Sequence, residues 1–175
     1  MVEIAYWSGT GNTEAMAQEI AAAAKAAGAD VESVLMEDTT PDAVAQHDVI
    51  LLGCPAMGSE ELEDSVVEPF FTAIAPKLSG KKVGLFGSYG WGTGEWMDTW
   101  KQRAQDAGAI VFGTAIVNET PDNSEECAAL GKAAAAQAQI YRPTPFLSYK
   151  NGTDTEYPSA SVPFLLYVIN VGTDL

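Results

Sequence analysis

The amino-acid sequence predicts a doubly wound α/β fold, in which helices cover both faces of a parallel sheet. Apolar runs alternate with helix-prone segments along residues 1–138, the order expected of such a sheet. The run Val49-Ile50-Leu51-Leu52 contains no polar residue, as expected of a strand buried on both faces. A loop of glycines and hydroxyl side chains, residues 8–13, follows the first apolar run, at a point where folds of this class bind ligands.

The first half of the chain is expected to contain three strands and two helices. Residues 2–7 form the first strand, and the alanine-rich residues 13–27 form a helix that stops at Gly28. A second strand, a short helix and the apolar third strand then follow. Their predicted ranges are residues 31–36, 41–46 and 48–53.

The second half of the chain repeats this alternation. A turn at residues 79–81 opens the fourth strand, Gly108 ends the fourth helix, and the last helix is again rich in alanine. The predicted helices are residues 62–74, 95–107 and 123–137, and the predicted strands are residues 82–87 and 109–117.

The sequence changes character after Gln139. Two prolines within residues 141–145 indicate an extended linker. The pair Asn151-Gly152 favours a hairpin turn, and the apolar residues 164–171 favour a further strand. We therefore expect a domain over residues 1–138 and a C-terminal β-prone appendage over residues 139–175. The appendage is expected to pack on the open sheet edge or on a second chain.

The charge balance excludes two classes of partner. The chain carries 24 acidic and 9 basic residues, a net charge of −15. Nucleic acid and anionic membrane surfaces would be repelled, whereas basic protein surfaces would be attracted. The strand pattern begins at once, without a signal peptide, and residues 163–171 are too short to span a bilayer. A cytoplasmic location is expected.

The cysteines and the histidine do not suggest a metal site or a catalytic site. Cys54 and Cys127 belong to no C-x-x-C pair and no Cys/His cluster, which argues against zinc or dithiol chemistry. Cys54 ends an apolar run and is expected to pack in the core. The single histidine, His47, lies in a polar turn, where a solvated side chain is expected rather than a ligand or a base.

The loop Ser8-Gly9-Thr10-Gly11-Asn12-Thr13 is the strongest candidate for a binding site. Backbone N–H groups and the positive end of the helix dipole favour an anion at such a junction. The loop contains no lysine or arginine and matches neither the P-loop nor the G-x-G-x-x-G fingerprint. A resident cofactor's monophosphate fits it better than a nucleoside triphosphate, and a tight turn with capping hydroxyls is the alternative.

Two further segments follow predicted strands at the same end of the sheet. The third strand leads into Pro55-Ala56-Met57-Gly58-Ser59-Glu60, and the fourth leads into Ser88-Tyr89-Gly90-Trp91-Gly92. Each segment combines a flexible backbone with one large side chain. Met57 and Trp91 are suited to cover the two faces of a planar ring, although packing on the protein body is the alternative for both.

Together the three segments resemble the FMN-binding loops of the flavodoxins, above all the short-chain flavodoxins of anaerobic bacteria. The resemblance covers residues 1–138, with the elements in the right order, and does not extend to the appendage. It implies a flavodoxin-like five-stranded sheet of order 2-1-3-4-5. It also implies non-covalent FMN and a low-potential one-electron carrier, not an enzyme, that uses the semiquinone/hydroquinone couple.

The resemblance also assigns roles to individual residues. Ser8, Thr10, Asn12 and Thr13 would hold the FMN phosphate together with backbone amides of the 8–13 loop. Met57 and Trp91 would sandwich the isoalloxazine ring. Glu60 would accept a hydrogen bond from ring N3–H, and Gly58 would lie in a turn whose peptide flips on reduction. The implied site comprises Ser8, Gly9, Thr10, Gly11, Asn12, Thr13, Pro55, Ala56, Met57, Gly58, Ser59, Glu60, Ser88, Tyr89, Gly90, Trp91 and Gly92.

Three other functions compete with that of a carrier. An FMN-dependent quinone or NAD(P)H reductase of the same fold would need room for a second substrate over the ring, which a covering Trp91 would restrict. A receiver domain would place an aspartate after the third strand, where Gly53-Cys54-Pro55 stands. An assembly module built on a carrier remains open, because the appendage carries no motif that defines its role.

Overall fold

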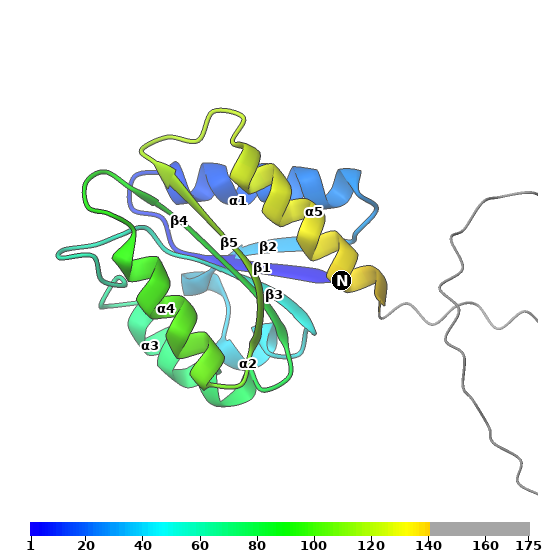
Figure 1. Ribbon diagram of the computed structural model, residues 1–175. Coiled ribbons are helices and arrows are strands. Elements are labelled where there is room, and N and C mark those ends of the chain that lie inside the picture. Colours follow the sequence, from blue (N-terminus) through cyan, green and yellow to red (C-terminus); the bar gives the residue numbers. More distant parts are fainter. Residues whose placement is uncertain (141–175) are drawn as a thin grey trace, which may run out of the picture. The chain divides into compact units, whose positions relative to one another are not determined.

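The computed structural model describes residues 1–140, in which a five-stranded parallel sheet lies between two layers of helices (Figure 1). The strands lie in the order β2-β1-β3-β4-β5, which confirms the predicted fold class. The expected hairpin and final strand of the appendage fall outside the described residues. The strands are β1 (Val2–Tyr6), β2 (Val31–Leu35), β3 (Val49–Gly53), β4 (Lys82–Tyr89) and β5 (Ile110–Asn118).

The helices divide between the two faces of the sheet. α1 (Asn12–Ala26) and α5 (Glu125–Ile140) cover one face, while α2 (Pro41–Val44), α3 (Val67–Ile74) and α4 (Glu95–Asp106) cover the other (Figure 1). Two short 3₁₀ helices, Met36–Asp38 and Ala75–Lys77, complete the described elements. None of the helices within residues 1–140 is long and apolar enough to cross a membrane.

A separate apolar core fills each layer. Met16 and Ile20 of α1 pack with Leu130 of α5 on one side, and Trp96 and Trp100 of α4 are fully buried on the other. β1 and β3 between them are buried along their whole length. Burial on both faces explains why β3 contains no polar residue, and it fixes the strand ends from which the site loops leave.

Two element boundaries differ from the prediction in ways that matter for the site. β4 continues through Ser88 and Tyr89, which pair with Val117 and Asn118 of β5, so these two residues lie on a strand and not in a loop. α3 begins at Val67 and not at residue 62. The N–H groups of Val66 and Val67 donate to the buried Glu63 carboxylate, which caps the helix from a preceding loop.

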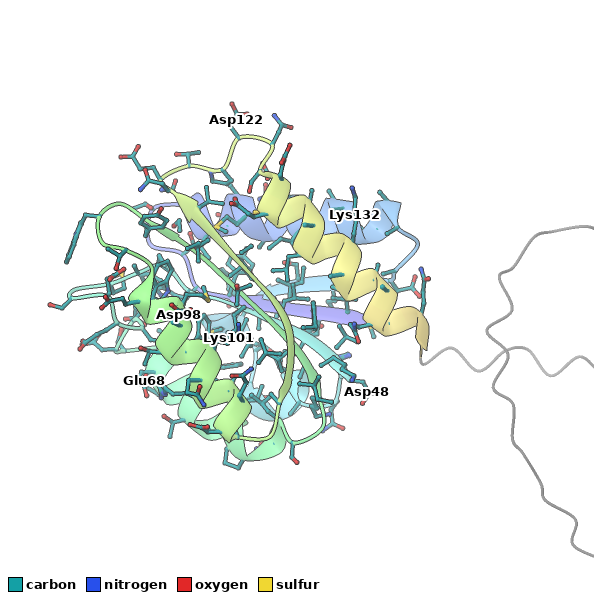
Figure 2. The ribbon with its side chains drawn as sticks, viewed as in Figure 1. Asp48, Glu68, Asp98, Lys101, Asp122 and Lys132 are labelled. Atoms are coloured by element: carbon teal, nitrogen blue, oxygen red, sulfur yellow. The ribbon has the colours of Figure 1, made fainter. Side chains whose placement is uncertain are left out.

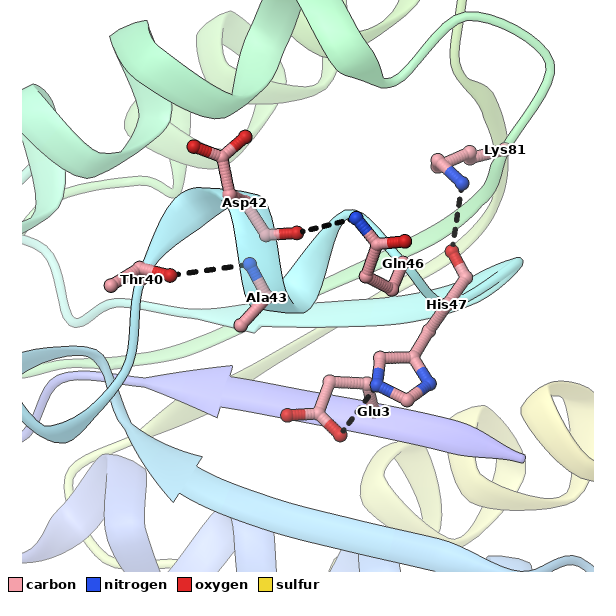
Figure 3. Close-up of polar contacts among 7 residues, drawn as sticks. All are labelled: Glu3, Thr40, Asp42, Ala43, Gln46, His47 and Lys81. Carbon is pink, nitrogen blue, oxygen red and sulfur yellow. Dashed lines mark hydrogen bonds and ion pairs between the residues drawn. The ribbon is translucent and has the colours of Figure 1, made fainter.

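His47 is only partly exposed, so it is less solvated than its polar turn suggests. Its side chain is 22% exposed, and Nε2 lies 3.7 Å from Glu3 Oε2 on β1 (Figure 3). Lys81 Nζ donates to the His47 carbonyl oxygen at 3.1 Å. Burial raises the pKa of Glu3 above its ordinary value, although His47 opposes the shift. This pair lies where β1 begins, at the end of the sheet opposite the 8–13 loop.

Candidate functional site

The three predicted loops meet at the carboxyl ends of β1, β3 and β4. Together they border a cavity of about 420 Å³, within the range typical of small-ligand sites. The cavity therefore joins segments that lie far apart in the sequence. Its lining residues are Trp7, Gly9, Thr10, Asn12, Pro55, Ala56, Met57, Ser88, Tyr89, Gly90, Trp91 and Glu119.

The 8–13 loop presents backbone donors that are not used within the described residues. Ser8 Oγ accepts from the N–H groups of Gly11 at 3.1 Å and Glu14 at 3.2 Å. No acceptor within residues 1–140 is found for the N–H groups of Gly9, Thr10, Asn12 and Thr13. Four free donors at the start of α1 form a cradle with the geometry to hold an anion without any basic side chain.

Thr13 contributes its backbone N–H to this cradle, while its hydroxyl is bonded to the sheet. The side chain is buried, and its Oγ1 lies 3.3 Å from Ser88 Oγ at the end of β4. This contact ties the loop to the sheet. The backbone N–H of Thr13 is the group that remains available for an anion.

Met57 lies at the start of a tight hairpin. The N–H of Met57 donates to the carbonyl oxygen of Glu61 at 3.0 Å, and the reverse bond measures 2.8 Å. Between them Gly58 has φ +49° and Glu60 has φ +58°. A Cβ at Gly58 would meet no atom within 4 Å, so backbone strain and not lack of space favours glycine there.

The side chains of Trp91 and Tyr89 differ in how far they are packed against the protein. Trp91 is 68% exposed and borders the cavity, while Met57 is 37% exposed. Tyr89 packs inward against Trp96, with ring centroids 5.9 Å apart, and its carbonyl oxygen accepts from Glu119 N–H at 2.7 Å. Trp91 is thus free to contact a ligand, whereas Tyr89 anchors the segment to the core.

The Glu60 carboxylate links two of the site loops. Its Oε1 accepts from the N–H groups of Thr93, Gly94 and Glu95 at 2.9, 2.6 and 3.2 Å. Glu60 therefore caps α4, whose N-cap residue, Gly94, has no side chain to do so. Desolvation opposes ionisation, but the bonds from Gly94 and Thr93 outweigh it and hold the Glu60 pKa below its ordinary value.

Several predicted residues support the cavity without bordering it. Gly92, at φ +104°, lies so close to Glu60 that an added Cβ would meet its Cδ at 2.6 Å, so a side chain there would displace the cap. The predicted residues that do not border the cavity are Ser8, Gly11, Thr13, Gly58, Ser59, Glu60 and Gly92.

Two residues that border the cavity are absent from the predicted site. Trp7 follows β1 directly, and Glu119 follows β5. Both stand at carboxyl ends of parallel strands, the signal that would have found them. The hydroxyl of Thr120, next to Glu119, donates to Asn12 Oδ1 at 3.3 Å, which brings the loop after β5 to the 8–13 loop.

Cys54 packs in the core as predicted. Its side chain is fully buried, and burial raises the pKa of its thiol to about 12. The sulfur accepts from Glu63 N–H at 3.4 Å, which closes the base of the loop that carries Met57. Cys54 is therefore a structural residue of the site and not a reactive one.

Charge is distributed unevenly over the described part of the chain. The loops and helix starts at the carboxyl end of the sheet span residues 7–14, 54–68, 89–98 and 118–126, which contain many carboxylates and no lysine or arginine. Asp122 lies in the loop between β5 and α5, whereas Lys132 lies farther along α5 (Figure 2). The cavity therefore opens on the acidic end of the molecule.

Comparison with known proteins agrees with this geometry. The family model described as Flavodoxin matches residues 4–131. The chain is 80% identical over 135 residues to the flavodoxin of Megasphaera elsdenii, a match that covers 77% of this chain and 98% of that protein. It is 45% identical over 136 residues to the flavodoxin of Clostridium beijerinckii, covering 77% and 99%.

The fold agrees as well. The solution structure of the two-electron reduced Megasphaera elsdenii flavodoxin superposes with a TM-score of 0.75 at 79% identity, covering 78% of this chain and 99% of that one. Fold, sequence and the three converging loops lead to one assignment. The chain belongs to the flavodoxin family of FMN-containing electron carriers.

Proposed function

We propose that the cavity between the three loops binds FMN non-covalently, and that the described domain carries single electrons at low potential between redox enzymes. When bound, FMN supplies the one-electron chemistry. The observation that carries the proposal is the convergence of four unused backbone donors with Met57 and the exposed Trp91 around one cavity.

The 8–13 loop would hold the phosphate. The free N–H groups of Gly9, Thr10, Asn12 and Thr13 favour an anion that is held without a lysine or arginine side chain. Ser8 Oγ already accepts two backbone hydrogen bonds, so its own O–H remains to donate. Neutral donors suit the phosphate of a resident cofactor. Such a phosphate takes no part in a reaction, so no basic side chain is needed to neutralise charge that develops on it.

Met57 and Trp91 would cover the two faces of the ring, and Glu60 would accept from N3–H. Glu60 Oε1 is occupied by three backbone N–H groups, whereas the only donor to Oε2 within residues 1–140 is Thr93 Oγ1, at 3.3 Å. Oε2 is therefore the oxygen with capacity for the ring. The cap on α4 fixes the carboxylate in place.

The acidic surroundings support a low potential. Glu60 and Glu119 stand at the cavity or beside it, and no basic residue lies in the surrounding loops. Carboxylates and apolar contacts disfavour extra negative charge on a bound ring. The second electron should therefore be harder to add than it is in free FMN.

Stepwise reduction of the purified holoprotein, followed by its absorption spectrum, tests the proposal. A neutral one-electron-reduced flavin should accumulate before full reduction. Absence of flavin, or a single two-electron step, would contradict it. Oxidation of NAD(P)H by the protein alone would identify a flavin reductase instead.

The preferred partners are proposed to be redox proteins with basic docking faces. The acidic end of the sheet surrounds the cavity, and charge complementarity speeds association. Electron-transfer rates with such a partner should fall as salt rises, since screening acts within about 8–10 Å. Rates that do not change between low and high salt would exclude electrostatic steering.

A cytoplasmic location is supported by two buried free thiols.

A further inference from the structure

The loop between β5 and α5, residues 119–124, is held against the start of α1. Its first residue, Glu119, borders the proposed FMN cavity. The backbone φ of Glu119 is +57°, a value that residues other than glycine seldom adopt. Such a conformation persists only where surrounding contacts hold it, so the loop depends on contacts with its neighbours.

Two contacts with α1 hold this loop. Thr120 Oγ1 donates to Asn12 Oδ1 at 3.3 Å, and the Glu19 carboxylate accepts from the N–H groups of Asn123 and Ser124, both at 3.0 Å. Asn12 and Glu19 lie two turns apart on one face of α1, a rise of about 10 Å. Three residues of extended chain, the separation of Thr120 and Asn123, cover about the same distance. The loop and the helix therefore match in register.

The Thr120 contact determines which end of the Asn12 side-chain amide is left for a ligand. Asn12 borders the cavity at the first position of α1. Its amide has one acceptor oxygen and two N–H donors on Nδ2. Thr120 occupies the oxygen, and no acceptor for Nδ2 is found within residues 1–140. A phosphate would be attracted by the N–H groups and repelled by the oxygen, so this orientation of the amide suits an anion.

We infer that Thr120 and Glu19 are positioning residues for the cofactor phosphate. Thr120 keeps the Asn12 amide in the orientation that leaves its N–H groups for the phosphate. Glu19 keeps the loop in the register at which Thr120 reaches Asn12. Neither Thr120 nor Glu19 borders the cavity, so both act through Asn12. The inference rests on the proposed function, in which the 8–13 loop holds the phosphate of FMN.

Comparison of FMN with riboflavin, which lacks the phosphate, tests the role of Thr120. The apoprotein of the full-length chain is titrated with each ligand. Thr120→Val removes the hydroxyl at nearly constant volume, and Thr120→Ser retains it. Thr120→Val should lose roughly fivefold in FMN affinity, as expected for one hydrogen bond, and less than about twofold in riboflavin affinity. Thr120→Ser should recover most of the loss, and Thr114→Val, at an exposed position on β5, is the matched control.

Glu19 is tested in the same titrations. Glu19→Gln should also lower FMN affinity more than riboflavin affinity, whereas Glu125→Gln, at an exposed position on α5, should change neither. Adding Glu19→Gln to Thr120→Val should cost little more than Thr120→Val alone, because both residues act through Asn12. In phosphorus NMR of the holoprotein, the signal of the bound phosphate should shift in Thr120→Val and not in Thr114→Val.

The outcomes separate this inference from the proposed function. An unchanged ratio of FMN to riboflavin affinity in Thr120→Val, or equal losses for both ligands, would overturn the positioning role and leave FMN binding intact. A wild-type protein that binds riboflavin as tightly as FMN would overturn both the positioning role and the phosphate site.

Discussion

Trp91 is the most exposed large apolar side chain of the described part, which makes it the most informative single residue. If it covers a flavin face, Trp91→Ala should weaken FMN binding by about 1–3 kcal/mol, the range for an aromatic stacking contact. Equilibrium titration of the apoprotein measures this. Trp91→Phe should recover most of the loss, whereas equal affinity in wild type and Trp91→Ala would show that the indole does not touch the ring.

Gly58 tests the hairpin. Gly58→Thr should lower the accumulation of the one-electron-reduced flavin while oxidised FMN stays bound, because a β-branched residue resists positive φ. Potentiometry measures the effect. Gly80→Thr is the matched control, since Gly80 also has positive φ (+75°) and open space around its Cβ. An unchanged one-electron state in Gly58→Thr would contradict a role for this turn in reduction.

Residue types predicted the residues that border the cavity better than the contacts that support them. The 8–13 loop was recognisable because it combines glycines with hydroxyl side chains, and Met57 and Trp91 because each large side chain stands beside glycine after a strand. The Glu60 cap on α4 was not predicted, because it joins residues more than 30 positions apart. The fully buried Thr13–Ser88 contact likewise depends on tertiary packing. Whether each predicted residue contacts FMN remains a prediction.

At the scale of elements, the base of the Met57 loop depends on the start of α3. Glu63 is buried, and its carboxylate accepts from Ser65 Oγ and from the N–H groups of Ser65, Val66 and Val67. Helix-prone composition placed the helix start at residue 62. Instead, the Glu63 carboxylate accepts from the first N–H groups of the helix, so the helix begins after it. Helix propensity alone does not predict this later start.

The Glu63 cap predicts a pH-dependent stability. Burial opposes ionisation, but the hydrogen bonds from Ser65, Val66 and Val67 outweigh it and lower the Glu63 pKa. A carboxylate whose pKa is lower in the folded than in the unfolded state stabilises the fold at any pH above its unfolded-state pKa. This stabilisation is lost as the pH falls through the folded-state pKa. Glu63→Gln should therefore cost about 1–2 kcal/mol at neutral pH.

Urea unfolding of the holoprotein measures this difference. It should shrink as pH falls below the ordinary glutamate pKa of about 4.3, because the wild-type carboxylate becomes protonated. Glu125→Gln, at an exposed position on α5, should change stability little at any pH. A Glu63→Gln deficit that stays constant into acid would point to lost packing rather than lost charge.

At the scale of the whole molecule, the sheet separates two ends of different character. The acidic carboxyl end holds the cavity that we propose binds FMN, while the amino end holds Lys77, Lys81 and Lys82 and the Glu3–His47 pair. Strand order was predictable because alternating strands and helices allow few topologies. The distribution of charge over the surface was not, since it needs the fold first.

The appendage gives the last prediction. The relatives from Megasphaera and Clostridium match over 135 and 136 residues that span 98% and 99% of their own lengths, so they have no counterpart of residues 141–175. We propose that this segment serves packing or self-association and takes no part in electron transfer. Truncation after Gln139 should therefore leave the flavin spectrum and one-electron reduction unchanged.

Light scattering decides between the two versions of this proposal. A change from dimer to monomer on truncation would support self-association, and a monomer in both proteins would support packing within one chain. In the full-length chain, Phe164→Ser with Val168→Ser removes apolar surface without changing charge and should reproduce the effect of truncation. If the truncated protein stays folded but loses FMN, the appendage belongs to the cofactor site, and the proposal is wrong.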